Sequence, residues 1–113
     1  MANGATLEEA FRGVVVAEEA PLRALWEGLT PLQQNVLRAL AVRAAGLTTA
    51  ATRRGFSLGA QGAATKAAQT LVARDLLVKD DTGYRFDNPF MRGWVILYAL
   101  PDVGRTLPVM HVP

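Results

Sequence analysis

Residues 58–78 read LGAQGAATKAAQTLVARDLLV, and this stretch decides the fold of the chain. Gly59 and Gly62 supply a flexible turn. After them, alanine and leucine fall on one face of a predicted helix, while threonine, lysine and glutamine fall on the other. An apolar run to Val78 and a turn at Thr82-Gly83 then predict a short hairpin. A helix that leads directly into a hairpin is typical of the second half of a winged helix-turn-helix.

The segment before this helix predicts the other half of the motif. Thr30-Pro31-Leu32-Gln33 combines an N-cap residue, a proline at the first helical position and a capping box. An apolar stripe runs from Leu32 to Ala44, and Gly46 is expected to end this helix. A short helix then runs to Arg54 and is expected to end at Gly55.

Further helices are predicted at both ends of this core. Thr6 and Glu9 form a capping box before a helix from about Leu7 to Glu19. Pro21 cannot lie within that helix, so a second helix from Pro21 to Gly28 is expected. After the hairpin, Asp87-Asn88-Pro89 opens a last helix that runs to about Leu100.

The predicted fold class is mainly α. It is a winged helix-turn-helix with a short two-stranded β-wing and additional N- and C-terminal helices. We divide the chain into a helical lead-in over residues 1–28 that packs on the core, a winged-helix domain over 29–100 and an extended tail over 101–113.

The composition argues against catalysis and metal binding. The 113 residues include no cysteine, and the single histidine, His111, lies in the tail. No serine-histidine or cysteine-histidine pair can be assembled. Lys66 does not directly follow Gly62, as it would in a nucleotide-binding phosphate loop. We therefore expect no enzyme activity, cofactor, metal or small-molecule substrate for this chain.

Charge and hydropathy place the chain among soluble proteins. The net charge is +2, and no basic block or tail marks it as a nucleic-acid binder by itself. No apolar run is as long as a membrane span, and the first residues lack a signal-peptide pattern. We expect a cytoplasmic protein that makes no membrane contact.

Nucleic-acid binding is the chemistry that the predicted motif favours. The predicted recognition helix carries side chains able to hydrogen-bond with bases or phosphates, namely Gln61, Thr65, Lys66 and Gln69. Cations that could contact phosphates flank it: Arg53, Arg54, Lys79 and Arg85. The helix itself has one lysine, and Asp80 and Asp81 at the wing tip repel phosphates. We therefore expect modest affinity for duplex DNA that falls steeply with salt.

The last predicted helix is apolar almost all round. Such a helix either closes the core of its own domain or also faces a partner. In the second interpretation the contact residues are Phe90, Met91, Trp94 and Tyr98. The partner would be an upstream domain or a second copy in a homo-oligomer.

Two segments resemble a known family. Residues 25–41 read LWEGLTPLQQNVLRALA and residues 71–95 read LVARDLLVKDDTGYRFDNPFMRGWV. They are similar to the C-terminal winged-helix domain of archaeal and bacterial AAA-type P-loop ATPases. The resemblance implies a domain of a larger protein whose nucleotide-binding module lies upstream. The family's nucleotide-binding residues have no matching positions here.

Three functional hypotheses follow. The leading one is a non-catalytic winged-helix module of a larger ATPase that binds duplex DNA with modest or low sequence specificity. The second is a protein-interaction module that docks on its own ATPase domain or on a partner subunit. The third is a stand-alone dimeric transcriptional regulator.

Overall fold

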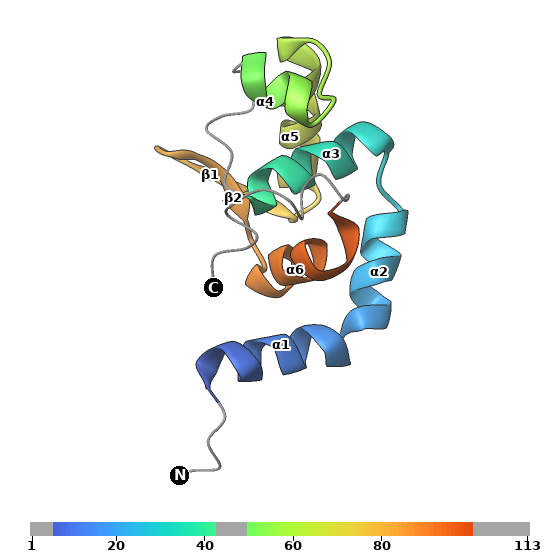
Figure 1. Ribbon diagram of the computed structural model, residues 1–113. Coiled ribbons are helices and arrows are strands. Elements are labelled where there is room, and N and C mark those ends of the chain that lie inside the picture. The colour runs from blue at the N-terminus through green and yellow to red at the C-terminus, as the bar shows by residue number, and fades with distance from the viewer. Residues whose placement is uncertain (1–5, 43–49, 101–113) are drawn as a thin grey trace.

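The computed structural model describes residues 6–42 and 50–100. The helices are α1 (Leu7–Ala17), α2 (Glu19–Glu27), α3 (Pro31–Ala41), α4 (Ala50–Gly55), α5 (Gln61–Ala73) and α6 (Pro89–Trp94), followed by the π-helical turn η1 (Val95–Ala99). Strands β1 (Leu77–Asp80) and β2 (Gly83–Phe86) form an antiparallel hairpin, the wing (Figure 1). The predicted winged helix-turn-helix is therefore confirmed. The predicted tail and Gly46 lie outside the described residues.

Local capping chemistry starts three of the helices where the sequence predicts. At α1, the Thr6 hydroxyl accepts from the Glu9 amide at 3.0 Å, and the Glu9 carboxylate accepts from the Thr6 amide at 2.8 Å. Thr30 and Gln33 form the same reciprocal pair at the start of α3. The Asn88 side chain accepts from the Phe90 amide at 2.9 Å and caps α6.

The helix boundaries differ from the prediction where proline acts. The first helix ends at Ala17, and α2 begins at Glu19, with Pro21 inside its first turn. The proline ring would clash with the carbonyl four residues earlier, which belongs to Ala17. The helical ladder therefore breaks there, earlier than the predicted end at Glu19.

Two helix ends use a left-handed residue that is not glycine. Helix α4 ends at Gly55, as expected, but the left-handed residue that follows it is Ser57, whose φ is 57°. Helix α5 ends at Ala73, and two residues later Asp75 has a φ of 63°. Beyond it, the Leu76 amide donates to the Leu71 carbonyl at 2.9 Å. This bond satisfies a carbonyl at the helix end, as in the Schellman motif.

One core joins the end helices to the winged-helix elements. Helices α1 and α2 contribute Val15, Leu22 and Trp26, all at most 7% exposed. These side chains belong to the same buried cluster as those of α3, α5, β1 and α6: Val36, Leu37, Ala64, Ala68, Leu71, Leu77, Met91 and Trp94. The wing and α5 are thus held on a scaffold to which the N-terminal helices contribute.

The C-terminal helix closes this core. Met91 and Trp94 are each 1% exposed, so these two residues are not on the surface and cannot meet a partner as predicted. Phe90 is half-buried and stacks on Phe11 of α1, with ring centroids 4.9 Å apart. Of the four residues predicted to contact a partner, Tyr98 is the most exposed, at 44%.

The crossing of α1 and α6 depends on Gly93. A Cβ atom at this position would lie 2.6 Å from Cε2 of Phe11 and 3.0 Å from Cγ2 of Val15. We expect Gly93→Ala to destabilise the domain by about 1–2 kcal/mol, since the Phe11 ring must move. The matched control is Gly13→Ala on α1, where a Cβ meets nothing within 4 Å. It should stabilise by roughly 0.5–1 kcal/mol through helix propensity.

Urea unfolding of the three proteins, followed by circular dichroism, measures both changes. A Gly93→Ala variant as stable as Gly13→Ala would contradict this account of the packing.

Candidate nucleic-acid interface

Helix α5 has the two faces that its sequence predicts. Ala64, Ala68 and Leu71 are completely buried against the rest of the domain. Lys66 and Gln69 are exposed on the outer side, and Thr65 is half-buried. Gln61 is the first residue of the helix. The face available to a ligand is therefore narrow and contains one cation.

The α4 arginines lie beside the turn that leads into α5. Arg54 is exposed and Arg53 is half-buried. Together with Ala50 and Gly59 they line an open hollow of about 260 Å³. Ala60 caps α5 without a side-chain hydrogen bond, so the positive end of the helix dipole adds to the field of these two arginines. The structure thus brings together Arg53, Arg54 and the start of the predicted recognition helix.

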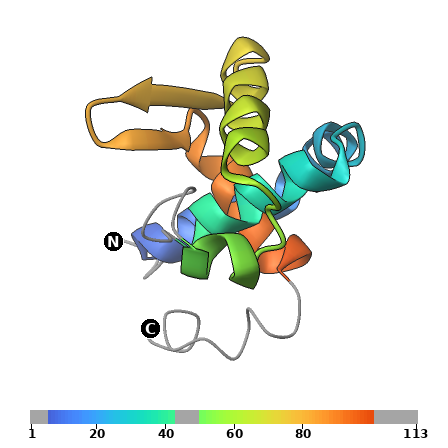
Figure 2. The ribbon, with the colours of Figure 1, turned by 90° about the horizontal axis from the view of Figure 1, so that it is seen from above.

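The wing carries the remaining predicted cations. Its strands pair Lys79 with Tyr84 and Val78 with Arg85. The Lys79 ammonium lies 5.6 Å from the centre of the Tyr84 ring, in cation–π range. Figure 2 shows the hairpin projecting from the domain beside α5, on the side away from α2. Lys79 and Arg85 are both exposed on this projection, so both remain predicted phosphate contacts.

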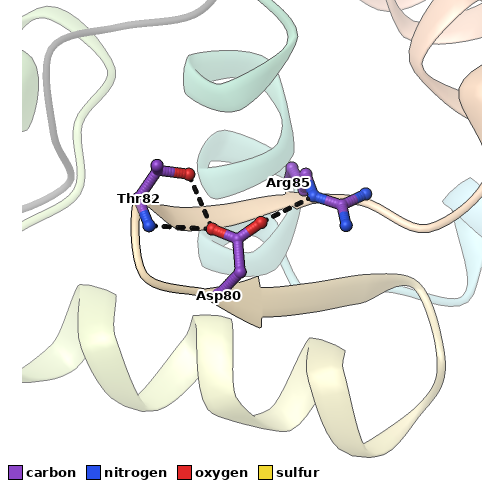
Figure 3. A network of polar contacts seen from close by, with 3 residues as sticks. All are labelled: Asp80, Thr82 and Arg85. Atoms are coloured by element: carbon purple, nitrogen blue, oxygen red, sulfur yellow. Dashed lines mark hydrogen bonds and ion pairs between the residues drawn. The ribbon is translucent and has the colours of Figure 1, made fainter.

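A polar network at the wing tip was not predicted from the sequence (Figure 3). Asp80 accepts from the Thr82 hydroxyl at 2.6 Å, from the Thr82 amide at 2.9 Å and from Nε of Arg85 at 2.8 Å. The Thr82 hydroxyl, followed by the Arg85 guanidinium, lowers the pKa of Asp80 well below its usual range. The carboxylate is therefore charged at neutral pH. Sequence reasoning identified Asp80 as a repulsive charge and Arg85 as a phosphate contact, but it did not predict that they pair.

Charge is segregated along the domain. Residues 50–86, which form α4, α5 and the wing, hold six cations and three anions, a net charge of +3. Residues 6–29, which form α1 and α2, hold five glutamates and two arginines, a net charge of −3. These two groups of elements lie toward opposite ends of the molecule (Figure 1). One of the cations, Arg74 at the end of α5, is exposed and was not among the predicted contacts.

Within the described residues, no group of three or more histidine, cysteine, aspartate or glutamate side chains is placed to hold a metal ion. No helix formed by that part of the chain has the length and apolar character needed to cross a membrane.

Comparison with known proteins identifies the family of this domain. A family model described as a probable winged helix domain matches residues 21–96, from the first turn of α2 into η1. No curated protein and no solved structure matches the chain.

The Asp80 network predicts a specific pH response. Because folding lowers the pKa of Asp80, its contribution to stability is present above the ordinary aspartate pKa of about 3.9 and is lost as the pH falls through the folded value. In a carboxyl ¹³C NMR titration we expect the Asp80 midpoint to lie below that ordinary value. Thr82→Val should raise the midpoint by removing the hydroxyl donor, and Arg85→Ala should also raise it.

Thr70→Val is the control, since the Thr70 hydroxyl donates to the Lys66 carbonyl within α5 instead. A wild-type midpoint at the ordinary aspartate value would show that the network does not form in solution.

Proposed function

Since this chain belongs to the family of probable winged helix domains, we propose that it is a non-catalytic module that binds duplex DNA with modest or low sequence specificity. Winged-helix domains in general bind DNA or proteins. The choice between these two partners rests on the surface of this particular domain.

The charge segregation carries the proposal. Phosphate contacts supply most of the affinity of non-specific DNA binding, and they require cations on one surface. Here the cations gather on α4, α5 and the wing, at a net charge of +3 for residues 50–86. The exposed large hydrophobic side chains of the described residues lie on other elements: Leu7, Val14, Val16, Leu25 and Tyr98. The surface formed by residues 50–86 therefore resembles a nucleic-acid-binding surface in composition more than it resembles a protein interface.

In this proposal α5 enters the major groove and α4 lies across the backbone. Lys66 is central to the exposed face of α5, with Gln69 and Thr65 beside it as candidates for base edges. Arg53 and Arg54 contact phosphates, while the side chain of Gln61 lies outside the described part of the structure. The outer face of α5 also carries small residues such as Ala63 and Ala73. Their methyl groups make few contacts that distinguish one base pair from another. Specificity is accordingly low.

The ATPase context is a further part of the proposal. It rests on the motif resemblance at residues 25–41 and 71–95. Nucleotide binding would belong to another module of such a protein, since these residues contain no phosphate-binding loop. A parent polypeptide that carries this domain and hydrolyses ATP would support the context, and a parent with no nucleotide-binding module would refute it.

The test is fluorescence anisotropy of a labelled random-sequence duplex at low and then physiological salt. We expect binding that weakens with salt, because each phosphate contact contributes about 0.9 to the slope of log K against log salt. Lys66→Ala with Arg54→Ala should lower the affinity at every sequence and reduce the slope by roughly 1–2.

Arg12→Ala on α1 is the matched control. Arg12 is an exposed arginine at the acidic end of the domain, and its loss should leave the slope unchanged. Absence of binding at low salt would exclude the DNA function for this domain. An equal effect of Arg12→Ala would place the binding surface elsewhere.

A second candidate function is protein contact, as a module that docks on an ATPase domain or partner subunit, or as a dimeric transcriptional regulator. The observation that favours it is the exposure of apolar side chains on α1. Leu7 is 88% exposed and Val14 is 40% exposed, and they lie two helical turns apart on the same side of α1. Val16, which is 53% exposed, lies on another side of this helix.

Sedimentation velocity tests the dimer. For a domain that pairs through the Leu7 and Val14 side of α1, Leu7→Ser with Val14→Ser should shift the equilibrium to monomer, because burial of apolar area drives such contacts. Val16→Ser is the control and should leave the equilibrium unchanged. A wild type that is monomeric at all concentrations would rule out the dimeric regulator.

A further inference from the structure

Arg85 is a predicted DNA contact whose guanidinium forms an ion pair within the wing. It stands in β2 opposite Val78, and its Nε donates to Oδ2 of Asp80 at 2.8 Å. Asp80 is the last residue of β1, at the point where the hairpin turns. Figure 3 shows Nε of Arg85 meeting the Asp80 carboxylate from the other strand of the hairpin, with Thr82 on the opposite side of that carboxylate.

The position of the Asp80 carboxylate is fixed by its other bonds. Its Oδ1 accepts from both the amide and the hydroxyl of Thr82, so the carboxylate is held at the turn independently of Arg85. The same bonds keep the pKa of Asp80 low, so protonation does not release Arg85 at neutral or mildly acidic pH. The Asp80 carboxylate therefore stays charged and in place as the ion-pair partner of the Arg85 guanidinium.

This pairing changes what a phosphate meets at the wing. A phosphate that approaches Arg85 also approaches the negative charge of Asp80, 2.8 Å from the arginine. The net charge of the pair is zero, so little is gained from releasing counterions there. Lys79, on the neighbouring strand, forms no ion pair with a carboxylate in the described structure.

We propose that Asp80 is a positioning residue that withholds Arg85 from the DNA backbone and so limits the affinity of this domain. The inference rests on the proposed function, because it concerns how strongly the same surface binds duplex DNA. Recognition is left to α4 and α5, while the wing contributes through Lys79. Removing the Asp80 charge converts Arg85 into a phosphate contact.

Asp80→Asn is the informative change. Asparagine keeps an oxygen that can accept from Thr82, so the turn retains its bonds while the charge that holds Arg85 is lost. The ion pair is exposed, with Arg85 at 65% and Asp80 at 39% side-chain exposure. Exposed pairs add little to stability, so the fold should be unaffected. A ¹H–¹⁵N NMR spectrum with wild-type peak positions away from the wing checks this.

The experiment compares five proteins in the anisotropy assay: wild type, Asp80→Asn, Arg85→Ala, the double variant Asp80→Asn with Arg85→Ala, and Asp81→Asn. We expect Asp80→Asn to bind about 3- to 10-fold more tightly at low salt, with a salt slope steeper by roughly 1, because one phosphate contact is added. Arg85→Ala should bind almost as wild type. The double variant should lose the gain.

Asp81→Asn separates the pairing from the simple loss of a negative charge. Asp81 follows Asp80 at the same turn and carries the same charge, but it is not the ion-pair partner of Arg85. Its substitution should give a smaller gain and leave the slope unchanged. An equal gain from Asp81→Asn, or a gain that persists in the double variant, would overturn the inference.

The outcomes also separate this inference from the proposed function. Wild-type binding without any gain in Asp80→Asn overturns the role of Asp80 alone. Binding that appears only in Asp80→Asn overturns the DNA function of the wild-type domain, although it supports the withholding of Arg85 by Asp80. No binding by either protein at low salt overturns the DNA function, and this inference with it.

Discussion

The contact between Trp26 and Trp94 is the interaction on which the rest of the structure depends. Their ring centroids lie 5.6 Å apart, and both residues are buried. Arg38 of α3 lies 4.9 Å above the Trp26 ring, and its Nε donates to the Ala99 carbonyl at 2.7 Å. On the other side, Nε1 of Trp94 donates to the Glu19 carboxylate at 3.1 Å. These contacts tie α2, α3, α6 and η1 into one unit, because Arg38 joins the Trp26 ring to the end of η1 and Glu19 of α2 accepts the buried indole N–H of Trp94.

Helix α3 connects this aromatic contact to α5, which forms part of the surface that we propose binds DNA. It packs on α5, whose Ala64 and Ala68 are completely buried. Small side chains allow two helices to approach closely, so the alanines of α5 serve the core. They also leave few positions for ligand chemistry on a helix of 13 residues. The modest affinity that we propose is therefore a consequence of how α5 is held.

Prediction from the sequence succeeded where the determining interactions are local. Thr6, Thr30 and Asn88 start their helices through bonds to amides two or three residues away, and such bonds can be inferred from residue order. It failed where the outcome depends on distant parts of the chain. The apolar pattern around Trp94 is the same whether a partner or α2 covers it, and only the three-dimensional structure distinguishes the two. The Asp80–Arg85 pair likewise depends on strand register and side-chain reach, which residue types do not specify.

The two candidate functions use opposite ends of the domain, so they do not exclude each other. In the proposed DNA function, the net charge of +3 over α4 to the wing and −3 over α1 and α2 would turn residues 50–86 toward the duplex. In that orientation α1 lies away from the duplex, with Leu7 and Val14 still exposed. The acidic charge that keeps α1 off the phosphates also leaves its apolar side available to a protein. Together the two proposals describe a domain that would connect DNA with another protein module, and the withholding of Arg85 by Asp80 would keep the DNA contact weak.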